Sequence, residues 1–178
     1  GFEKLTPAMT KELVESMFNE KQKKTMEATG EVDFAYTDTR VGRFRVNAFH
    51  QRGSYAAVLR IVASDIPTPE DLGVPEAVLG LTKKKRGLVL VTGPTGSGKS
   101  TTLASLIDVI NKERNEHIIT LEDPIEYLHK HNRSIVNQRE IGLDTDSYGN
   151  ALRAALREDP DIILVGEMRD FDTISTAI

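Results

Sequence analysis

The sequence predicts an α/β protein of two domains, in which a small α+β domain precedes a core with a mostly parallel sheet. Three observations lead to this prediction. Strand-like and helix-like segments alternate in the second part of the chain, and a proline-rich stretch separates that part from an earlier region with a different pattern. A glycine-rich motif between a predicted strand and a predicted helix identifies the second part as a phosphate-binding core.

The composition is that of a globular protein and excludes several classes of function. The chain has 178 residues, a net charge of −4 and no cysteine, so a disulfide framework and a thiolate-ligated zinc site are both excluded. It has no apolar run near the ~18 residues that predict a membrane span. The mild acidity argues against nucleic acid as the main partner, and the basic run at 83–86 is typical of a solvated helix end.

The first domain, residues 1–63, is predicted to contain one helix followed by three antiparallel strands. Thr6 is a candidate N-cap with Pro7 at the first helical position, which predicts an amphipathic helix over 6–20. The residues expected on its buried face are Met9, Leu13, Met17 and Phe18. Alternating apolar residues and short turns predict strands at 31–37, 42–49 and 56–62.

Residues 64–75 carry three of the chain's seven prolines and are predicted to form a linker. From residue 76 to 178 the segments alternate between strand and helix patterns, and the strands are nearly continuous apolar runs. Such runs are typical of a parallel sheet with helices on both faces. The predicted strands span 87–92, 117–123, 134–141 and 161–167, and the predicted helices begin near Lys99 and Tyr148.

The sequence 93–101 matches the phosphate-binding pattern G-x-x-x-x-G-K-[ST]. Its glycines allow successive backbone N–H groups to approach phosphate oxygens, and the following helix adds partial positive charge. Lys99 is expected to contact the β- and γ-phosphates, and Ser100 to offer its hydroxyl to Mg²⁺. The predicted nucleotide-binding residues are Gly93, Pro94, Thr95, Gly96, Ser97, Gly98, Lys99, Ser100 and Thr101.

Two acidic residues at the ends of predicted strands are candidates for metal binding and water activation. Glu122 follows the run 117–121, and Glu167 follows the apolar run 162–165 as in a Walker B pattern. A carboxylate at such a place can hold a metal-bound water or orient the nucleophile. A metal site around His129 and His131 is not expected, because no third and fourth ligand is identifiable.

Several motifs together resemble the secretion ATPases of type II secretion and type IV pili, over nearly the whole chain. Within that superfamily, the segments 137–142 and 157–170 are most similar to the PilT-type retraction motors, and the absence of cysteine also favours these over PilB- and GspE-type motors with a zinc insertion. The motifs that carry the resemblance are RFRVNAFHQRG, VTGPTGSGKSTTL, HIITLEDPIEY, NQREIG and ALRAALREDPDIILVGEMRD.

The resemblance implies a RecA-like ATPase core after a PAS-like first domain. It further implies a homohexameric ring that hydrolyses ATP with Mg²⁺ to retract a pilus, on the cytoplasmic face of a bacterial inner membrane and docked to a platform protein. Glu122 is favoured as the general base and Glu167 as the residue that organises Mg²⁺, although the two roles could be reversed. Arg45 and Arg60 would contact the γ-phosphate of a neighbouring subunit.

Other functions remain open at this point. Pilus extension or type II secretion is the nearest alternative, and a nucleotide kinase or a nucleic-acid translocase on a P-loop core is more distant. The sequence does not begin with Met and stops inside the helical pattern 170–178, which predicts a fragment truncated at both ends.

Overall fold

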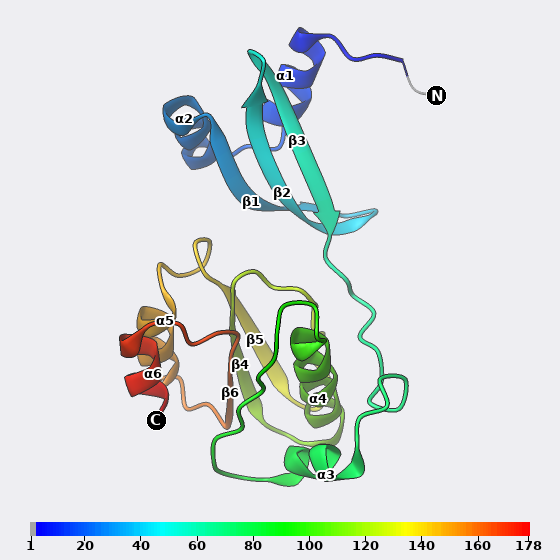
Figure 1. Ribbon diagram of the computed structural model, residues 1–178, viewed down its shortest axis with the longest axis vertical. Coiled ribbons are helices and arrows are strands. Elements are labelled where there is room, and N and C mark those ends of the chain that lie inside the picture. Colours follow the sequence, from blue (N-terminus) through cyan, green and yellow to red (C-terminus); the bar gives the residue numbers. More distant parts are fainter. Residues whose placement is uncertain (1–2) are drawn as a thin grey trace. The chain divides into compact units, whose positions relative to one another are not determined.

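The computed structural model describes residues 3–178 and divides into two compact units, Gly1–Val62 and Ala63–Ile178 (Figure 1). The first unit holds an antiparallel sheet of three strands and the second a parallel sheet of three strands. Each unit has apolar clusters of its own, so the burial that stabilises one does not depend on the other.

The first unit begins with two helices where the sequence predicted one. Helix α1 spans Pro7–Glu15 and α2 spans Glu20–Thr29. Thr6 caps α1 as predicted, because its side chain accepts a hydrogen bond from the backbone N–H of Met9. The predicted helix over 6–20 is wrong beyond α1, since Asn19 and Gln22 form a capping box that starts a second helix.

The buried face of α1 also differs from the prediction. Met9 and Leu13 are 46% and 53% exposed, whereas Val14 is buried and Met17 and Phe18 pack against the core. Only the end of α1 and the turn after it therefore contribute to the core, because the apolar contacts of this segment begin at Val14.

The predicted strands of the first unit are confirmed. They are β1 (Glu31–Asp38), β2 (Gly42–Gln51) and β3 (Ser54–Ile61), paired in the order β1-β2-β3. Alternate residues of β1 and β2 point into the core, as expected of a sheet with one covered face. The buried residues of this core are Val14, Met26, Val32, Phe34, Val46 and Ala48.

The second unit contains a parallel sheet in the order β5-β4-β6, with β4 buried at its centre. Three of the four strands predicted for this part are confirmed. Its elements are α3 (Glu76–Leu79), the 3-10 helix η1 (Gly80–Lys83), α4 (Lys99–Glu113), β4 (His117–Glu122), β5 (Ile135–Glu140), α5 (Tyr148–Ala155), β6 (Ile162–Val165) and α6 (Phe171–Ala177).

Helices cover both faces of this sheet (Figure 1). Ile118 of β4 packs with Ile107 and Ile110 of α4 on one face. Ile119 and Leu121, the alternate residues of the same strand, pack with α5 and the end of α6 on the other face. This arrangement explains why β4 is apolar on both sides, as its sequence predicts.

The strand predicted at 87–92 is absent from the structure. This segment pairs with no other strand among residues 3–178, and Leu88, Val89 and Leu90 are 55%, 50% and 60% exposed. An apolar, β-branched run becomes a strand only when a neighbour completes its ladder of hydrogen bonds. The phosphate-binding motif is therefore preceded here by an irregular segment.

Candidate nucleotide-binding site

The glycine-rich motif forms a tight loop that ends at the first residue of α4. Gly93, Gly96 and Gly98 have φ angles of 154°, 79° and 88°, a region that other L-residues rarely adopt. A Cβ at Gly93 would also lie 2.8 Å from Oγ of Ser97. These glycines are thus required by the path of the loop.

The start of α4 is suited to an anion. This helix has 15 residues, and no acidic residue lies in its first turn, so its free N–H groups and dipole are not neutralised by a carboxylate. Lys99 is the first residue of the helix, and its Nζ donates hydrogen bonds to the carbonyl oxygens of Gly93 and Pro94, both at 2.9 Å. The lysine ammonium is therefore held directly across the loop.

A cavity of about 460 Å³ joins the loop to the ends of two strands. The predicted loop residues that line it are Thr95, Gly96, Gly98, Lys99, Ser100 and Thr101. The strand ends contribute Glu122, the last residue of β4, with Asp123 after it, and Gly166 and Glu167 after β6. The other predicted loop residues, Gly93, Pro94 and Ser97, do not line this cavity; Gly93 and Pro94 supply the carbonyls that hold Lys99.

The Glu122 carboxylate is half-buried and fixed by two donors. Its Oε1 accepts hydrogen bonds from Oγ1 of Thr120 at 2.6 Å and from Nε2 of Gln138 at 3.2 Å. Burial raises the pKa of Glu122, although the bonds from Thr120 and Gln138 oppose the shift. A carboxylate with a raised pKa and a fixed orientation is suited to accept a proton.

The Glu167 carboxylate has a more open environment. Its Oε2 lies 2.8 Å from Nη2 of Arg169, and the two side chains are 32% and 82% exposed. Ser100 and Glu167 line the same cavity, and a hydroxyl and a carboxylate are the oxygen ligands that Mg²⁺ prefers. The predicted metal-binding pair is thus chemically suitable.

The predicted arginines Arg45 and Arg60 lie in the first unit, on β2 and β3. They are direct cross-strand partners on one face of the sheet, opposite the face that carries the core residues Val46 and Ala48. Like charges at opposed positions are destabilising, so this pair is not explained by the stability of the sheet. It is suited to bind an anion.

The sequence did not identify two polar residues that organise the site. Gln138 of β5 donates to Glu122 and to the carbonyl of Tyr127 at 2.9 Å, and accepts from the backbone N–H of His129 at 2.7 Å. Tyr148 lines the cavity from the start of α5. The rule that ligands bind at the carboxyl ends of parallel strands could have indicated Gln138, because it is the register partner of Thr120.

His129 and His131 lie in the second unit, and their contacts there are to the protein itself. Nδ1 of His131 accepts a hydrogen bond from the backbone N–H of Val136 at 3.0 Å, and burial lowers the pKa of His129. Among residues 3–178, no three His, Cys, Asp or Glu side chains are grouped to hold a metal ion. Over the same residues, no helix combines the length and apolarity needed to cross a bilayer.

Comparison with known proteins gives this geometry a family context. The family described as Type II/IV secretion system protein matches residues 22–178. The chain is 52% identical over 166 residues to the type IV pilus retraction ATPase PilT of Pseudomonas aeruginosa, which covers 93% of this chain and 48% of that protein. It is 47% identical over 174 residues to the type IV pilus ATPase PilU of the same organism, and this match covers 98% of this chain and 46% of that protein.

A solved structure is similar over most of the fold. The crystal structure of the pilus retraction motor PilT with bound ADP has a TM-score of 0.93 and 58% identity, and the match covers 97% of this chain and 50% of that one. The chain thus spans about half the length of these relatives. From its sequence and its fold, the chain belongs to the type II/IV secretion system protein family.

Proposed function

We propose that this chain binds ATP and Mg²⁺ and belongs to an ATP-hydrolysing motor that retracts type IV pili. One observation carries the proposal: a glycine-rich loop, the start of α4 and two strand-end glutamates line a single cavity. The retraction ATPase among the relatives and the ADP-bound retraction motor support the assignment to retraction rather than extension. In this proposal, residues 1–63 are a PAS-like domain, 64–75 a linker and 76–178 part of a RecA-like core.

The loop and the helix start would bind the phosphates. Lys99 would exchange its loop carbonyls for β- and γ-phosphate oxygens, which carry negative charge and accept stronger hydrogen bonds. Ser100 would hold Mg²⁺ directly and Glu167 would hold it through water. The ion would neutralise charge on the phosphates.

Glu122 would act as the general base. Its carboxylate would take a proton from a water molecule while the oxygen of that water attacks the γ-phosphorus, and the bond to the bridging oxygen of ADP would break. The hydrogen bonds from Thr120 and Gln138 hold the carboxylate in one orientation, which lowers the cost of reaching the reactive geometry.

The energy of hydrolysis would move one subunit against another. Arg45 and Arg60 would contact the γ-phosphate held by a neighbouring subunit, so that nucleotide state controls the arrangement of a homohexameric ring. In the cell the ring would act on the cytoplasmic face of a bacterial inner membrane, docked to the platform protein of the pilus.

Replacement of Lys99 tests the nucleotide site. In the complete protein, Lys99→Ala should lower ATP turnover roughly 10³-fold, while the fold persists. Lys112→Ala is a matched control, because Lys112 lies on the same helix in an exposed ion pair with Asp108. Turnover above a tenth of wild type in Lys99→Ala would contradict the proposal.

Subunit mixing tests the motor. Rings that contain both Arg60→Ala and Lys99→Ala subunits should recover ATPase activity that neither variant has alone, because each supplies what the other lacks. Native mass spectrometry would verify that mixed rings form. No recovery of ATPase activity at any mixing ratio would refute the trans role of Arg60. In a separate assay, stimulation of ATP turnover by DNA or RNA would favour a translocase.

A further inference from the structure

Tyr148 combines a buried ring with a hydroxyl at the nucleotide cavity. The side chain is 9% exposed, and its ring packs with Ile119, Leu121 and Leu152 beneath the parallel sheet. The residue also lines the cavity that Ser100 and Glu167 line. A phenylalanine would fill the same apolar volume, so the packing of the core does not explain the hydroxyl.

The Tyr148 hydroxyl belongs to the same cavity as the carboxylates of Glu122, Asp123 and Glu167. Burial raises the pKa of Tyr148, and the charges of Glu167, Asp123 and Glu122 raise it further. Within residues 3–178, this hydroxyl makes no hydrogen bond to another side chain or to the backbone. A phenol hydroxyl can donate one hydrogen bond, and a carboxylate beside it can accept that bond.

Gly166 allows the hydroxyl to approach the end of β6. Its backbone N–H donates to the carbonyl of Leu121 at 2.7 Å, which extends the pairing of β6 with β4 by one residue. A Cβ at this position would lie 3.1 Å from that carbonyl oxygen and 3.3 Å from the Tyr148 hydroxyl oxygen. The tyrosine oxygen is therefore next to the residue that precedes Glu167.

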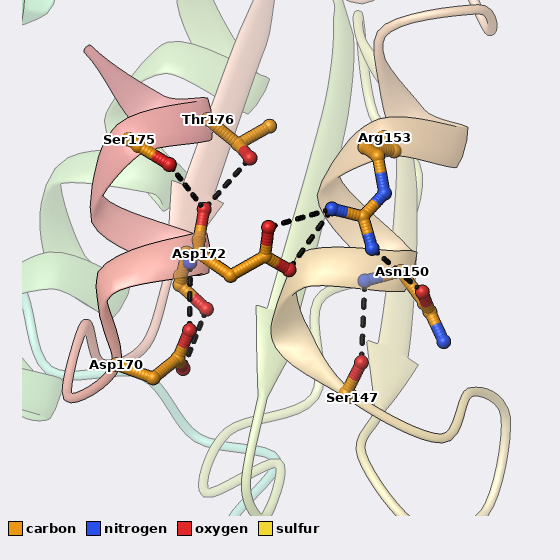
Figure 2. Close-up of polar contacts among 8 residues, drawn as sticks. Ser147, Asn150, Arg153, Asp170, Asp172, Ser175 and Thr176 are labelled. Carbon is orange, nitrogen blue, oxygen red and sulfur yellow. Dashed lines mark hydrogen bonds and ion pairs between the residues drawn. The ribbon is translucent and has the colours of Figure 1, made fainter.

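Contacts between α5 and α6 connect the helix that begins at Tyr148 with the segment that follows Glu167. Figure 2 shows Nη1 of Arg153, on α5, donating to both carboxylate oxygens of Asp172, on α6, at 2.9 Å each. A Cβ at Gly149 would collide with that carboxylate. Asp170 caps α6 by accepting from the N–H and hydroxyl of Thr173, both at 2.7 Å, and so fixes the segment 166–170 at its far end.

We propose that Tyr148 is a positioning residue of the nucleotide site, whose hydroxyl donates a hydrogen bond to the Glu167 carboxylate when ATP and Mg²⁺ are bound and then holds that carboxylate toward the cavity. The ion pair with Arg169 involves Oε2 of Glu167, and Oε1 forms no ion pair among the described residues. Arg169 is 82% exposed, so its contact alone holds the carboxylate weakly. This inference rests on the proposed role of Glu167 in organising Mg²⁺.

The test removes only the tyrosine oxygen. In the complete protein, Tyr148→Phe should lower kcat roughly tenfold, the effect of one hydrogen bond to a charged group, and leave KM for ATP within twofold. The Mg²⁺ concentration for half-maximal binding of a fluorescent ATP analogue should rise several-fold, whereas binding of the analogue without Mg²⁺ should be unchanged. Tyr36→Phe, which removes a phenolic oxygen from the first unit, is the matched control.

A double variant separates this inference from the function on which it rests. If Tyr148 acts through Glu167, Tyr148→Phe combined with Glu167→Gln should need no more Mg²⁺ for half-maximal binding than Glu167→Gln alone. The role of Tyr148 would be overturned if the double variant showed the product of the two single effects on the Mg²⁺ requirement. It would also be overturned if Tyr148→Phe equalled wild type in both kcat and Mg²⁺ requirement. An unchanged Mg²⁺ requirement in Glu167→Gln would instead refute the proposed metal site, and the role of Tyr148 with it.

Discussion

The ends of β4 and β6 carry the same type of residue in different surroundings. The two strands pair in parallel, with Leu121 opposite Val165, and each leads to a glutamate that lines the cavity. Glu122 is held by two neutral donors and has a raised pKa, whereas Glu167 is paired with an exposed arginine. In the proposed assignment, the surroundings of the two glutamates, rather than their residue type, would make one a proton acceptor and the other a carboxylate that organises Mg²⁺.

The largest expected effect comes from exchanging each carboxylate for an amide. Glu122→Gln should lower turnover roughly 10²- to 10⁴-fold while ATP binding persists, because the amide keeps the shape and loses the base. Glu167→Gln should mainly raise the Mg²⁺ concentration required for half-maximal binding of the ATP analogue. Turnover assays and binding of a fluorescent ATP analogue would measure the two effects. Near-wild-type turnover in Glu122→Gln together with an inactive Glu167→Gln would reverse the assignment.

The next largest effect concerns the tight end of β6. Gly166→Ala should destabilise the protein by roughly 1–3 kcal/mol, because the new Cβ would press on the carbonyl of Leu121 and on Tyr148. Gly80→Ala is the control: Gly80 has φ −58° and open space around its would-be Cβ, so this change should be neutral or stabilising by about 0.4–1 kcal/mol. Urea unfolding would compare them, and equal midpoints would show that the β6 end tolerates a side chain.

A smaller effect concerns the pH dependence of activity, if Glu122 is the general base as proposed. Thr120 is buried, and its hydroxyl stabilises the ionised form of Glu122. Thr120→Val keeps the shape and removes this donor, so the pKa of Glu122 should rise further above its usual value. Since the base acts when deprotonated, activity should be lost at a higher pH on acidification than in wild type. An unchanged acid limb in the kcat profile would argue against Glu122 as the base.

The smallest effect is expected from the contact between α5 and α6. Arg153 and Asp172 are 45% and 61% exposed, and ion pairs this exposed contribute roughly 0.2–1 kcal/mol. Arg153→Ala should therefore change the free energy of unfolding by no more than about 1 kcal/mol. Urea unfolding of this variant, of Asp172→Asn and of the double variant would isolate the pair. A coupling energy near 3 kcal/mol would show that the pair supports the whole end of β6.

Structural features that depend on short local sequence patterns could be predicted from the sequence. The start of α4 at Lys99, the cap at Thr6 and the strands leading to Glu122 and Glu167 depend on a few neighbouring residues, and the structure has them where expected. The phosphate-binding loop belongs to the same class, because its three positive φ angles fall on glycines. The chemical roles of these residues stay predictions.

Features that depend on distant partners could not be predicted in the same way. The run 87–92 has strand composition, but a strand also needs a neighbour, and none pairs with it among residues 3–178. Gln138 reaches Glu122 because β4 and β5 pair in one register, and Tyr148 reaches the cavity because α5 packs on one face of the sheet. Neither the register nor the packing is contained in a local pattern.

The contact of Lys99 with its own loop has a consequence for the energetics of recognition. The ammonium bridges two loop carbonyls, so the loop has hydrogen bonds of its own that hold its backbone. Association would then exchange hydrogen bonds instead of folding a segment, and little conformational entropy would be lost. Calorimetry of nucleotide binding should accordingly give a heat-capacity change that corresponds to the buried surface of the ligand alone, without the added decrease that accompanies coupled folding.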